Sequence, residues 1–272
     1  MMADLIPDIK GPKLSPFSGA LENIEFLKEL GPDRSNWSSD TVPHSRVFLV
    51  RIEGTQYSLK VFNFFSLDEI RPFVFGGNHL LTDERVRYHL DPFYAECRAF
   101  GLLREKNKDH ALAVRCHGYA FLSQAIEDQI LEKFRIEDWN RQHEDEGRPL
   151  RAIIKDYIRF KSVCGRKRLS VMRSTLKKLN DMGIYNMDVR EANYLGGRLF
   201  DFSVAITPPH LSLWLKLRTR AEIQEDREYD LAAFDDMAMD IERERASKRA
   251  RWSQGALRPR RATTTRGISE GR

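Results

Sequence analysis

The sequence lacks long apolar runs, internal repeats and clustered cysteines. No stretch of about 18 consecutive apolar residues occurs, so we expect no transmembrane helix. The first eight residues lack the basic and apolar regions of a signal peptide, and we expect none. Cys97, Cys116 and Cys164 are odd in number and far apart, which favours buried thiols in a reducing compartment over disulfides. The seven histidines do not join them at zinc-like spacing, so we predict no zinc site.

Charge is distributed unevenly along the 272 residues. The length suits one large domain or two small lobes, and a hydrophobic content of 41% allows a sizeable core. The net charge is +5, but ten basic and two acidic residues between Arg243 and Arg272 give +8, which leaves −3 for the rest. Basic runs at 248–251 and 258–261 are typical of contacts with nucleic acid or nuclear import factors. A solvated tail without a dedicated partner is the alternative.

Periodicity and turn residues predict short strands and a few helices. Residues 1–20 contain three prolines and no periodic pattern, so we predict a flexible lead-in. Residues 63–91 look irregular, and the composition beyond Arg245 indicates a disordered tail. We expect strands at 47–52, 55–62, 111–118, 119–122 and 151–158, a strand or short helix at 24–30, and helices at 92–105, within 124–148, at 169–182 and at 230–245.

Two charged residues occupy apolar elements. The strands expected on either side of Glu53-Gly54 form a hairpin pattern, and Lys60 lies inside the second strand. Glu96 lies on the apolar stripe of the helix expected at 92–105. Since an unpaired buried charge is costly, these side chains should be paired or line a cleft.

A polar constellation lies in the segment 183–203. Asp188 and Asn193 have the spacing D-x-x-x-x-N, and Asp201 begins the sequence Asp-Phe-Ser eight residues later. These are the spacings of a kinase catalytic loop and of the metal-binding D-F-G, with Ser203 in place of glycine. The segment therefore predicts a polar cleft suited to phosphoryl transfer.

Phosphoryl transfer needs a lysine on the phosphates, an acid that holds this lysine, metal-binding oxygens and a base near the acceptor hydroxyl. The chain offers residues for these roles in kinase order: Lys60, Glu96, Asp188, Asn193 and Asp201. On these residues it resembles the protein-kinase-like superfamily. The resemblance implies that Lys60 and Glu96 serve ATP binding, that Asp188 is the catalytic base, and that Asn193 and Asp201 bind Mg²⁺.

Two further segments carry this resemblance. Residues 153–158 are similar to the hinge strand, which implies that adenine would contact the backbone near Asp156 and Ile158. The sequence Tyr-Asp-Leu-Ala around Asp230 is similar to the D-L-A helix of aminoglycoside-phosphotransferase-like enzymes, which implies that Asp230 braces the catalytic loop. Against activity, no G-x-G-x-x-G precedes Val47, Asn186-Met187 replaces the histidine and arginine of H-R-D, and no A-P-E follows Asp201.

A closer resemblance is to one fungal family. Residues 92–101, 184–194 and 199–207 together resemble the Fta-two family, described as subunits of the Sim-four inner-kinetochore complex. The resemblance covers about residues 24–240. It implies a nuclear protein at the kinetochore or centromere, bound to other kinetochore or chromatin proteins and acting in chromosome segregation by binding; a cytoplasmic location stays open.

We therefore expect an α+β, two-lobed protein-kinase-like fold with a shortened C-terminal lobe and a disordered basic tail. The expected parts are a lead-in at 1–20, an N-lobe with hinge at 21–158, a reduced C-lobe at 159–245 and the tail at 246–272. An interaction module with a candidate nucleotide site is the favoured function. An active atypical phosphotransferase using ATP and Mg²⁺ is the alternative, and a plain nucleic-acid-binding protein is the third. The residues leave open whether the chain is an enzyme.

Overall fold

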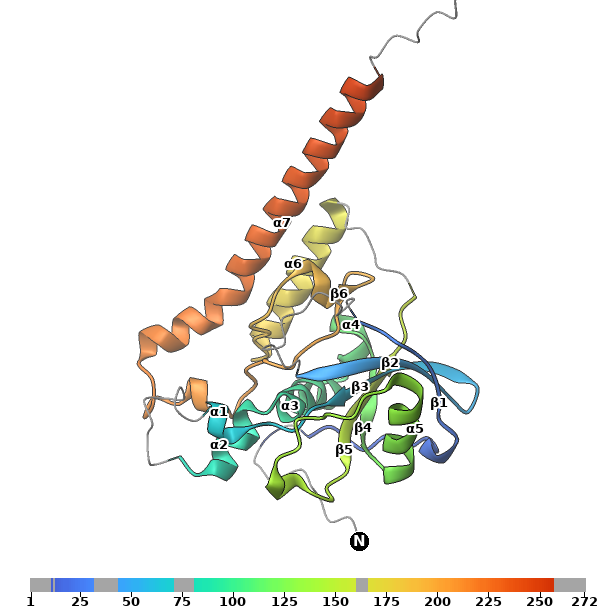
Figure 1. Cartoon of the computed structure of the whole chain (residues 1–272). Helices are drawn as coiled ribbons and strands as arrows, with labels where there is room; N and C mark the ends of the chain where they lie inside the picture. Colours follow the sequence, from blue (N-terminus) through green and yellow to red (C-terminus); the bar gives the residue numbers. More distant parts are fainter. Residues whose placement is uncertain (1–10, 12, 32–43, 71–80, 160–165, 257–272) are drawn as a thin grey trace, which may run out of the picture.

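The structure is a computed structural model that describes residues 11, 13–31, 44–70, 81–159 and 166–256. A sheet and helices that pack on both of its faces form the body, and one long helix extends away from it (Figure 1). The strands are β1 (Glu25–Glu29), β2 (Ser45–Ile52), β3 (Thr55–Phe62), β4 (Cys116–Leu122), β5 (Leu150–Asp156), β6 (Tyr194–Leu195) and β7 (Arg198–Leu199). The helices are α1 (Leu67–Ile70), α2 (Asp83–Leu90), α3 (Pro92–Glu105), α4 (Asp109–Leu112), α5 (Gln124–Phe134), α6 (Arg166–Asp181) and α7 (Arg220–Ala256).

The main sheet has the strand order β1-β2-β3-β5-β4, and every neighbouring pair is antiparallel. The hairpin predicted between β2 and β3 is confirmed, with a continuous register from Ser45 opposite Phe62 to Ile52 opposite Thr55. Its two-residue turn has positive φ at Glu53 (48°) and Gly54 (80°). Positive φ at both turn positions is what a type I′ turn requires, and this turn matches the twist of the strands.

Alternation along β3 sends its side chains to two separate apolar clusters. Leu59 and Val61 belong to a cluster with Ile126 and Ile130 of α5 on one face of the sheet. Phe62 belongs to the other cluster, on the face covered by α3. Because Lys60 alternates with Leu59 and Val61, it must point to the α3 face.

Helix α3 is fixed to the sheet at its first turn. Asp91 is the N-cap and accepts a hydrogen bond of 2.9 Å from the backbone N–H of Phe93, while Pro92 occupies the first turn, as predicted. The carboxylate of Asp91 is fully buried and pairs with Arg151 of β5. Arg151 also donates to the carbonyl of Asn63 at 3.0 Å. This buried ion pair was not predicted from the sequence, and it sets the position of α3 on the sheet.

The helices α6 and α7 and the small β6–β7 hairpin form the remainder of the body. The apolar cluster on the α3 face also contains Leu176 of α6, Phe234 of α7 and Phe202, which lies in the segment after β7. The rings of Phe202 and Phe100 meet edge to face with centroids 5.1 Å apart, which joins this part to α3. The predicted helix at 169–182 is confirmed, with an earlier start at Arg166.

Two of the three cysteines lie in the described part of the chain. Cys97 and Cys116 are free and buried, as predicted, and Cys164 lies outside the described residues. Burial raises the pKa of the Cys97 thiol well above its usual value and that of Cys116 to about 12, so both stay protonated and unreactive at neutral pH. Within the described residues, none of the helices is long and apolar enough to cross a membrane.

The structure differs from the predicted lead-in at residues 13–20. Leu14 is only 2% exposed. The backbone N–H of Phe17 donates to the carbonyl of Tyr119 at the edge of β4, and the N–H of Tyr119 donates to the carbonyl of Ser15. A side chain at Gly101 would come within 2.6 Å of the backbone at Lys13, so this glycine is what lets the segment pack on α3. The sequence did not reveal this contact, because the prolines suggested a loop and a short extended segment has no helical or strand periodicity.

Two further segments were assigned wrongly from the sequence. Residues 63–91, expected to be irregular, include α1 and α2, and α2 begins at the N-cap Thr82. Only Val86 and Tyr88 of α2 are buried, which leaves too short an apolar stripe to detect. The strand pair expected at 111–122 is the short helix α4 followed by the single strand β4.

The last helix is much longer than the predicted 230–245. Helix α7 runs from Arg220 to Ala256, so the prediction of disorder directly after Arg245 is wrong. Its distal residues are Arg, Ala, Lys, Glu and Gln in large part, and these residue types have high intrinsic helix propensity. Residues 257–272, the rest of the predicted tail, lie outside the described residues.

Candidate functional site: a buried ion cluster beside the catalytic-loop segment

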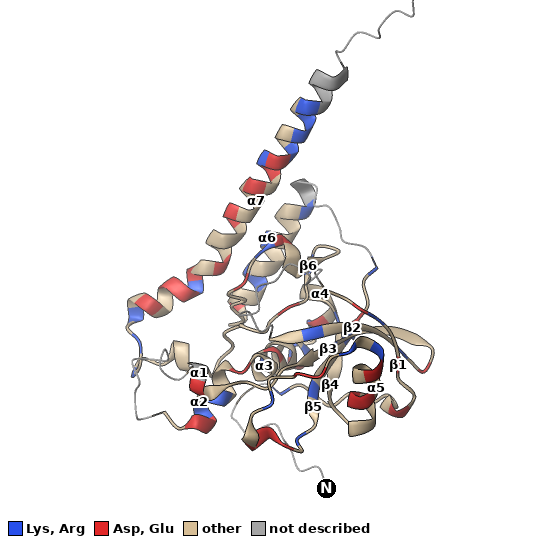
Figure 2. Ribbon diagram, in the orientation of Figure 1, with Lys and Arg blue, Asp and Glu red and all other residues tan. Residues whose placement is uncertain are grey.

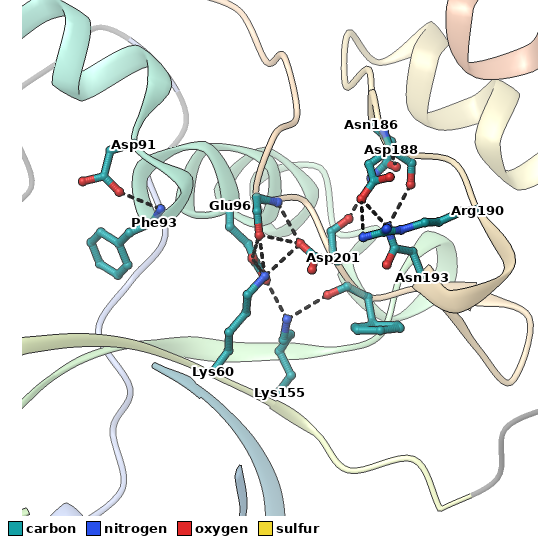
Figure 3. Close-up of polar contacts among 12 residues, drawn as sticks. Lys60, Asp91, Phe93, Glu96, Lys155, Asn186, Asp188, Arg190, Asn193 and Asp201 are labelled. Carbon is teal, nitrogen blue, oxygen red and sulfur yellow. Dashed lines mark hydrogen bonds and ion pairs between the residues drawn. The ribbon is translucent and has the colours of Figure 1, made fainter. Parts of the chain in front are cut away.

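The centre of the molecule holds a lysine paired with carboxylates from distant parts of the chain. Lys60 of β3 donates to Glu96 Oε2 at 2.7 Å and to Asp201 Oδ1 at 2.8 Å (Figure 3). The side chain of Lys60 is 3% exposed and that of Glu96 is fully buried. The structure therefore brings together three of the residues proposed from the sequence, from β3, α3 and the segment after β7.

A second lysine, not proposed from the sequence, completes the cluster. Lys155 of β5 donates to Glu96 Oε1 at 2.6 Å and to the carbonyl oxygen of Phe200 at 2.8 Å. In the β3–β5 ladder, Lys60 faces Ile153 and Ser58 faces Lys155, so both lysines lie on the α3 face. The signal that could have revealed Lys155 is a lysine at the end of an apolar strand, the same signal that singled out Lys60.

Ser203 adds a hydroxyl to the same cluster. Its Oγ accepts from Lys60 Nζ at 2.5 Å and donates to Asp201 Oδ1 at 2.6 Å. The backbone N–H of Ser203 also donates to Asp201 Oδ1, at 2.9 Å. An ammonium group has three N–H donors, and those of Lys60 have three acceptors here: Glu96, Asp201 and Ser203.

The charges of the cluster balance. Two lysines face two carboxylates, so the buried group is neutral as a whole. Burial by itself lowers the pKa of Lys60, but Asp201 and Glu96 outweigh burial and raise this pKa above its usual value. Burial by itself raises the pKa of Asp201, but Lys60 and Lys155, with hydrogen bonds from Lys60 and Ser203, hold it well below its usual range. Both Lys60 and Asp201 are therefore charged at neutral pH.

Asp188 and Asn193 form a second polar group beside the cluster (Figure 3). Asn193 is 4% exposed, and its amide donates to the backbone carbonyl of Asp188 at 2.9 Å and to its Oδ2 at 2.8 Å. The same Oδ2 pairs with Arg190 at 2.9 Å, and the side chain of Asp188 is 36% exposed. The hydrogen bonds between Asn193 and Asp188 thus connect the two ends of the D-x-x-x-x-N segment and hold the loop closed.

Asp230 of α7 binds the backbone at the start of this loop. Its carboxylate accepts from the backbone N–H of Asn186 at 2.6 Å and from that of Met187 at 2.8 Å. Burial raises the pKa of Asp230, and these two hydrogen bonds lower it in part. Met187 has a φ of 63°, so the two hydrogen bonds stabilise a left-handed backbone that is costly for methionine. The bracing contact expected for Asp230 is therefore present.

Asn186 joins the two polar groups. Its amide donates to the backbone carbonyl of Asp201 at 2.7 Å, and its Oδ1 accepts from the N–H of Asp188 at 3.2 Å. The asparagine thus supplies neutral hydrogen bonds at the position where the H-R-D pattern has a histidine.

The hinge residues proposed for adenine contact have contacts outside the ion cluster. The side chain of Asp156 is 47% exposed and contacts His117 Nε2 at 2.7 Å. Its backbone N–H donates to Arg115 at 3.0 Å, so this donor is already used. Ile158 is half-buried, near the turn between β6 and β7, where Gly196 lies.

Among the residues that the structure describes, no group of three or more His, Cys, Asp or Glu side chains is arranged to hold a metal ion. Asn193 and Asp201, proposed as metal ligands, belong to different polar groups: the Asn193 amide nitrogen donates to Asp188, and Asp201 Oδ1 accepts from Lys60. Lys60 and Asp201 Oδ1 already have partners from the chain itself, so a phosphate or Mg²⁺ at these atoms would have to displace them.

These features define an α+β protein with a neutral, buried ion cluster and a braced polar loop beside it. The family model of the kinetochore Sim4 complex subunit FTA2 matches residues 3–206, three quarters of the chain. The chain belongs to this family, and membership connects it with kinetochore partners and with chromosome segregation. The matched range includes the whole ion cluster and the loop. No curated protein matches the chain.

Proposed function

We propose that the chain is a kinase-like but non-catalytic subunit that binds other kinetochore proteins at centromeres in the nucleus. The strand order, the lysine of β3, the glutamate of α3 and the later Asp201 support kinase-like ancestry, since kinases use such a Lys–Glu pair and a metal-binding Asp. Family membership supports the kinetochore assignment.

One observation carries the non-catalytic part of the proposal: Lys60 has no donor left for a phosphate. Its three N–H groups are used by Glu96, Asp201 and Ser203, and its side chain is 3% exposed. Binding a nucleotide there would require breaking at least one buried, charge-assisted contact, which costs about 1.5–3 kcal/mol. With all its donors paired, the neutral cluster stabilises the packing of β3 against α3 and the segment that contains Asp201.

A substitution in the loop tests this proposal in cells. Asp188→Asn removes the carboxylate that a kinase would use as its base, but keeps the shape of the side chain. We expect the tagged variant to form centromeric foci, to purify with the same kinetochore proteins as the wild type and to support normal chromosome segregation. Glu191→Gln, an exposed change in the same loop, is the matched control.

Two outcomes would contradict the proposal. Loss of segregation with normal foci in Asp188→Asn, but not in Glu191→Gln, would indicate that the carboxylate has a chemical role. Diffuse cytosolic signal of the wild-type protein, without copurifying kinetochore proteins, would remove the kinetochore part.

An atypical phosphotransferase using ATP and Mg²⁺ is the second candidate. The observation that favours it is that two carboxylates of the predicted site remain accessible, since the side chains of Asp188 and Asp201 are 36% and 26% exposed. Its test is transfer of radiolabelled phosphate from ATP to the chain itself or to casein, compared between the wild type and Asp188→Asn. Transfer that is lost in the variant would favour this candidate over the binding subunit.

A further inference from the structure

Helix α7 has two parts that differ in their contacts. Up to Ile241, which is 8% exposed, it packs on the body, and Arg173 of α6 forms two hydrogen bonds with Asp235 at 2.7 and 2.8 Å. From Glu242 to Arg251 every residue is exposed except the half-buried Arg245. Figure 1 shows this distal part extending past the N-terminal end of α6. At 1.5 Å per residue, the part from Glu242 to Ala256 is about 22 Å long.

The charge of α7 reverses where the helix leaves the body (Figure 2). Residues 220–241 contain eight acidic and two basic side chains, a net charge of −6. Residues 242–251 contain five basic and two acidic side chains, a net charge of +3. The ion pairs Lys248–Glu244 and Arg243–Asp240 are exposed and screened by solvent, so they are weak and leave these cations available to a stronger partner.

A second basic segment lies at the same end of the molecule. Helix α6 begins with Arg166, Lys167 and Arg168. Asp230 contacts residues just after the end of α6, and Asp235 contacts its middle, so the two helices are antiparallel. The start of α6 is therefore near the place where α7 becomes basic. Cations at a helix N-terminus oppose the helix dipole, so they do not serve the stability of α6.

We propose that the distal part of α7 from Glu242 to Arg251, near the start of α6, binds the phosphate backbone of double-stranded DNA. The inference goes beyond the proposed function and does not depend on whether the ion cluster binds nucleotide. It adds a second kind of partner, nucleic acid, to the kinetochore proteins.

The arrangement of the cations favours DNA over an acidic protein surface. At about 100° per residue, Arg243, Arg245 and Arg251 point to three different sides of the helix. A flat acidic surface would engage one side only, whereas a DNA major groove about 12 Å wide has phosphates on both sides of an inserted helix. The apolar residues from Glu242 to Arg251 are two alanines, so this stretch lacks the large aromatic anchors of a protein interface.

The salt dependence of the DNA affinity measures how many cations contact phosphates. Five cations that contact phosphates predict a slope of about −4.5 in a plot of log K against log salt, which is an affinity loss of about 500-fold between about 50 and 200 mM. We expect fluorescence anisotropy of the full chain with a labelled duplex of about 20 base pairs to show at least this dependence. Replacing Arg245, Lys248 and Arg249 together by Glu should lower the magnitude of the slope by about three. Glutamate retains high helix propensity, and circular dichroism checks that α7 persists.

Matched variants separate the helix from general charge and from the basic residues beyond it. Replacing the exposed lysines Lys28, Lys106 and Lys108 by Glu makes the same change in net charge on the body and should leave the slope unchanged. Replacing the three arginines between 258 and 261 by Ala should have a smaller effect than the helix variant. Equal losses in the helix variant and the body variant, binding that depends on residues 258–261 alone, or preference for poly-glutamate over the duplex would each overturn the proposal.

Discussion

Glu96 is the residue whose removal tests the buried ion cluster most sharply. Its carboxylate is fully buried and accepts from Lys60 at 2.7 Å and from Lys155 at 2.6 Å. Glu96→Gln keeps the size of the side chain but turns a neutral cluster into one with an uncompensated positive charge. Breaking a buried pair in this way costs about 3–5 kcal/mol. For a chain of this size that corresponds to a melting temperature lower by about 6–20 °C.

Urea denaturation followed by tryptophan fluorescence and circular dichroism measures the loss, and the change in midpoint with a constant slope gives the free energy of unfolding. Glu105→Gln is the matched control on the same helix, because Glu105 is exposed, and it should change stability by less than about 0.5 kcal/mol. Adding Lys155→Met to Glu96→Gln restores charge balance and should recover at least about 1 kcal/mol. If Glu96→Gln costs less than about 1 kcal/mol, or if the second substitution adds to the loss, the cluster does not stabilise the fold as we infer.

Three further predictions follow from contacts outside this cluster. Asp230→Asn removes a charged acceptor from two backbone N–H groups and should cost about 1–3 kcal/mol, with faster amide hydrogen exchange at residues 186–193. Burial lowers the pKa of His210 to about 3, so below about pH 6.5 the unfolded state binds more protons than the folded state. The free energy of unfolding should therefore fall as the pH is lowered from about 6.5 to about 3. Urea midpoints measured across this range should fall less in His210→Gln than in the wild type. Gly101→Ala should displace residues 13–20, because its new Cβ would meet backbone at 2.6 Å, and should cost about 1–3 kcal/mol, with faster limited proteolysis near Leu14.

Each of these three predictions has an outcome that contradicts it. Unchanged hydrogen exchange in the loop would mean that Asp230 does not brace it. A pH dependence of stability that is identical in wild type and His210→Gln would show that this histidine is not held neutral by the fold. Resistance to proteolysis equal to that of Gly31→Ala, whose new Cβ has no neighbour within 4 Å, would show that residues 13–20 do not depend on Gly101.

The sequence predicted the parts of the site that rest on alternation along one element. Lys60 was predicted to lie inside an apolar strand and Glu96 on the apolar stripe of a helix, so both were expected to be paired or to line a cleft, and the structure pairs them. Asp91 and Pro92 marked the start of α3 correctly because capping is a local property. Periodicity and capping depend only on residues near one another in the sequence, so they can be predicted without knowing the fold.

Other parts depend on contacts between distant segments and could not be predicted. Lys155 reaches Glu96 only because β5 pairs with β3 in one particular register, and Ser203 bonds to Lys60 across 143 positions of sequence. The length of α7 was missed for another reason: from Glu242 to Arg251 all residues but the half-buried Arg245 are exposed, so no apolar stripe reveals the helix there. Sequence analysis therefore identified Lys60, Glu96 and Asp201, whereas Lys155 and Ser203 as their further partners required the fold.

Calorimetric titration of the purified chain with ATP and Mg²⁺ tests the central claim most directly, namely that the cluster uses all the donors of Lys60. We predict no saturable binding up to about 1 mM nucleotide, a limit that corresponds to about 4 kcal/mol of binding free energy. Asp188→Asn, in the loop beside the cluster, provides the comparison variant. Saturable binding by the wild type below about 1 mM that is weakened in Asp188→Asn would contradict the account, because it would show that the cluster opens and releases Lys60 for phosphate.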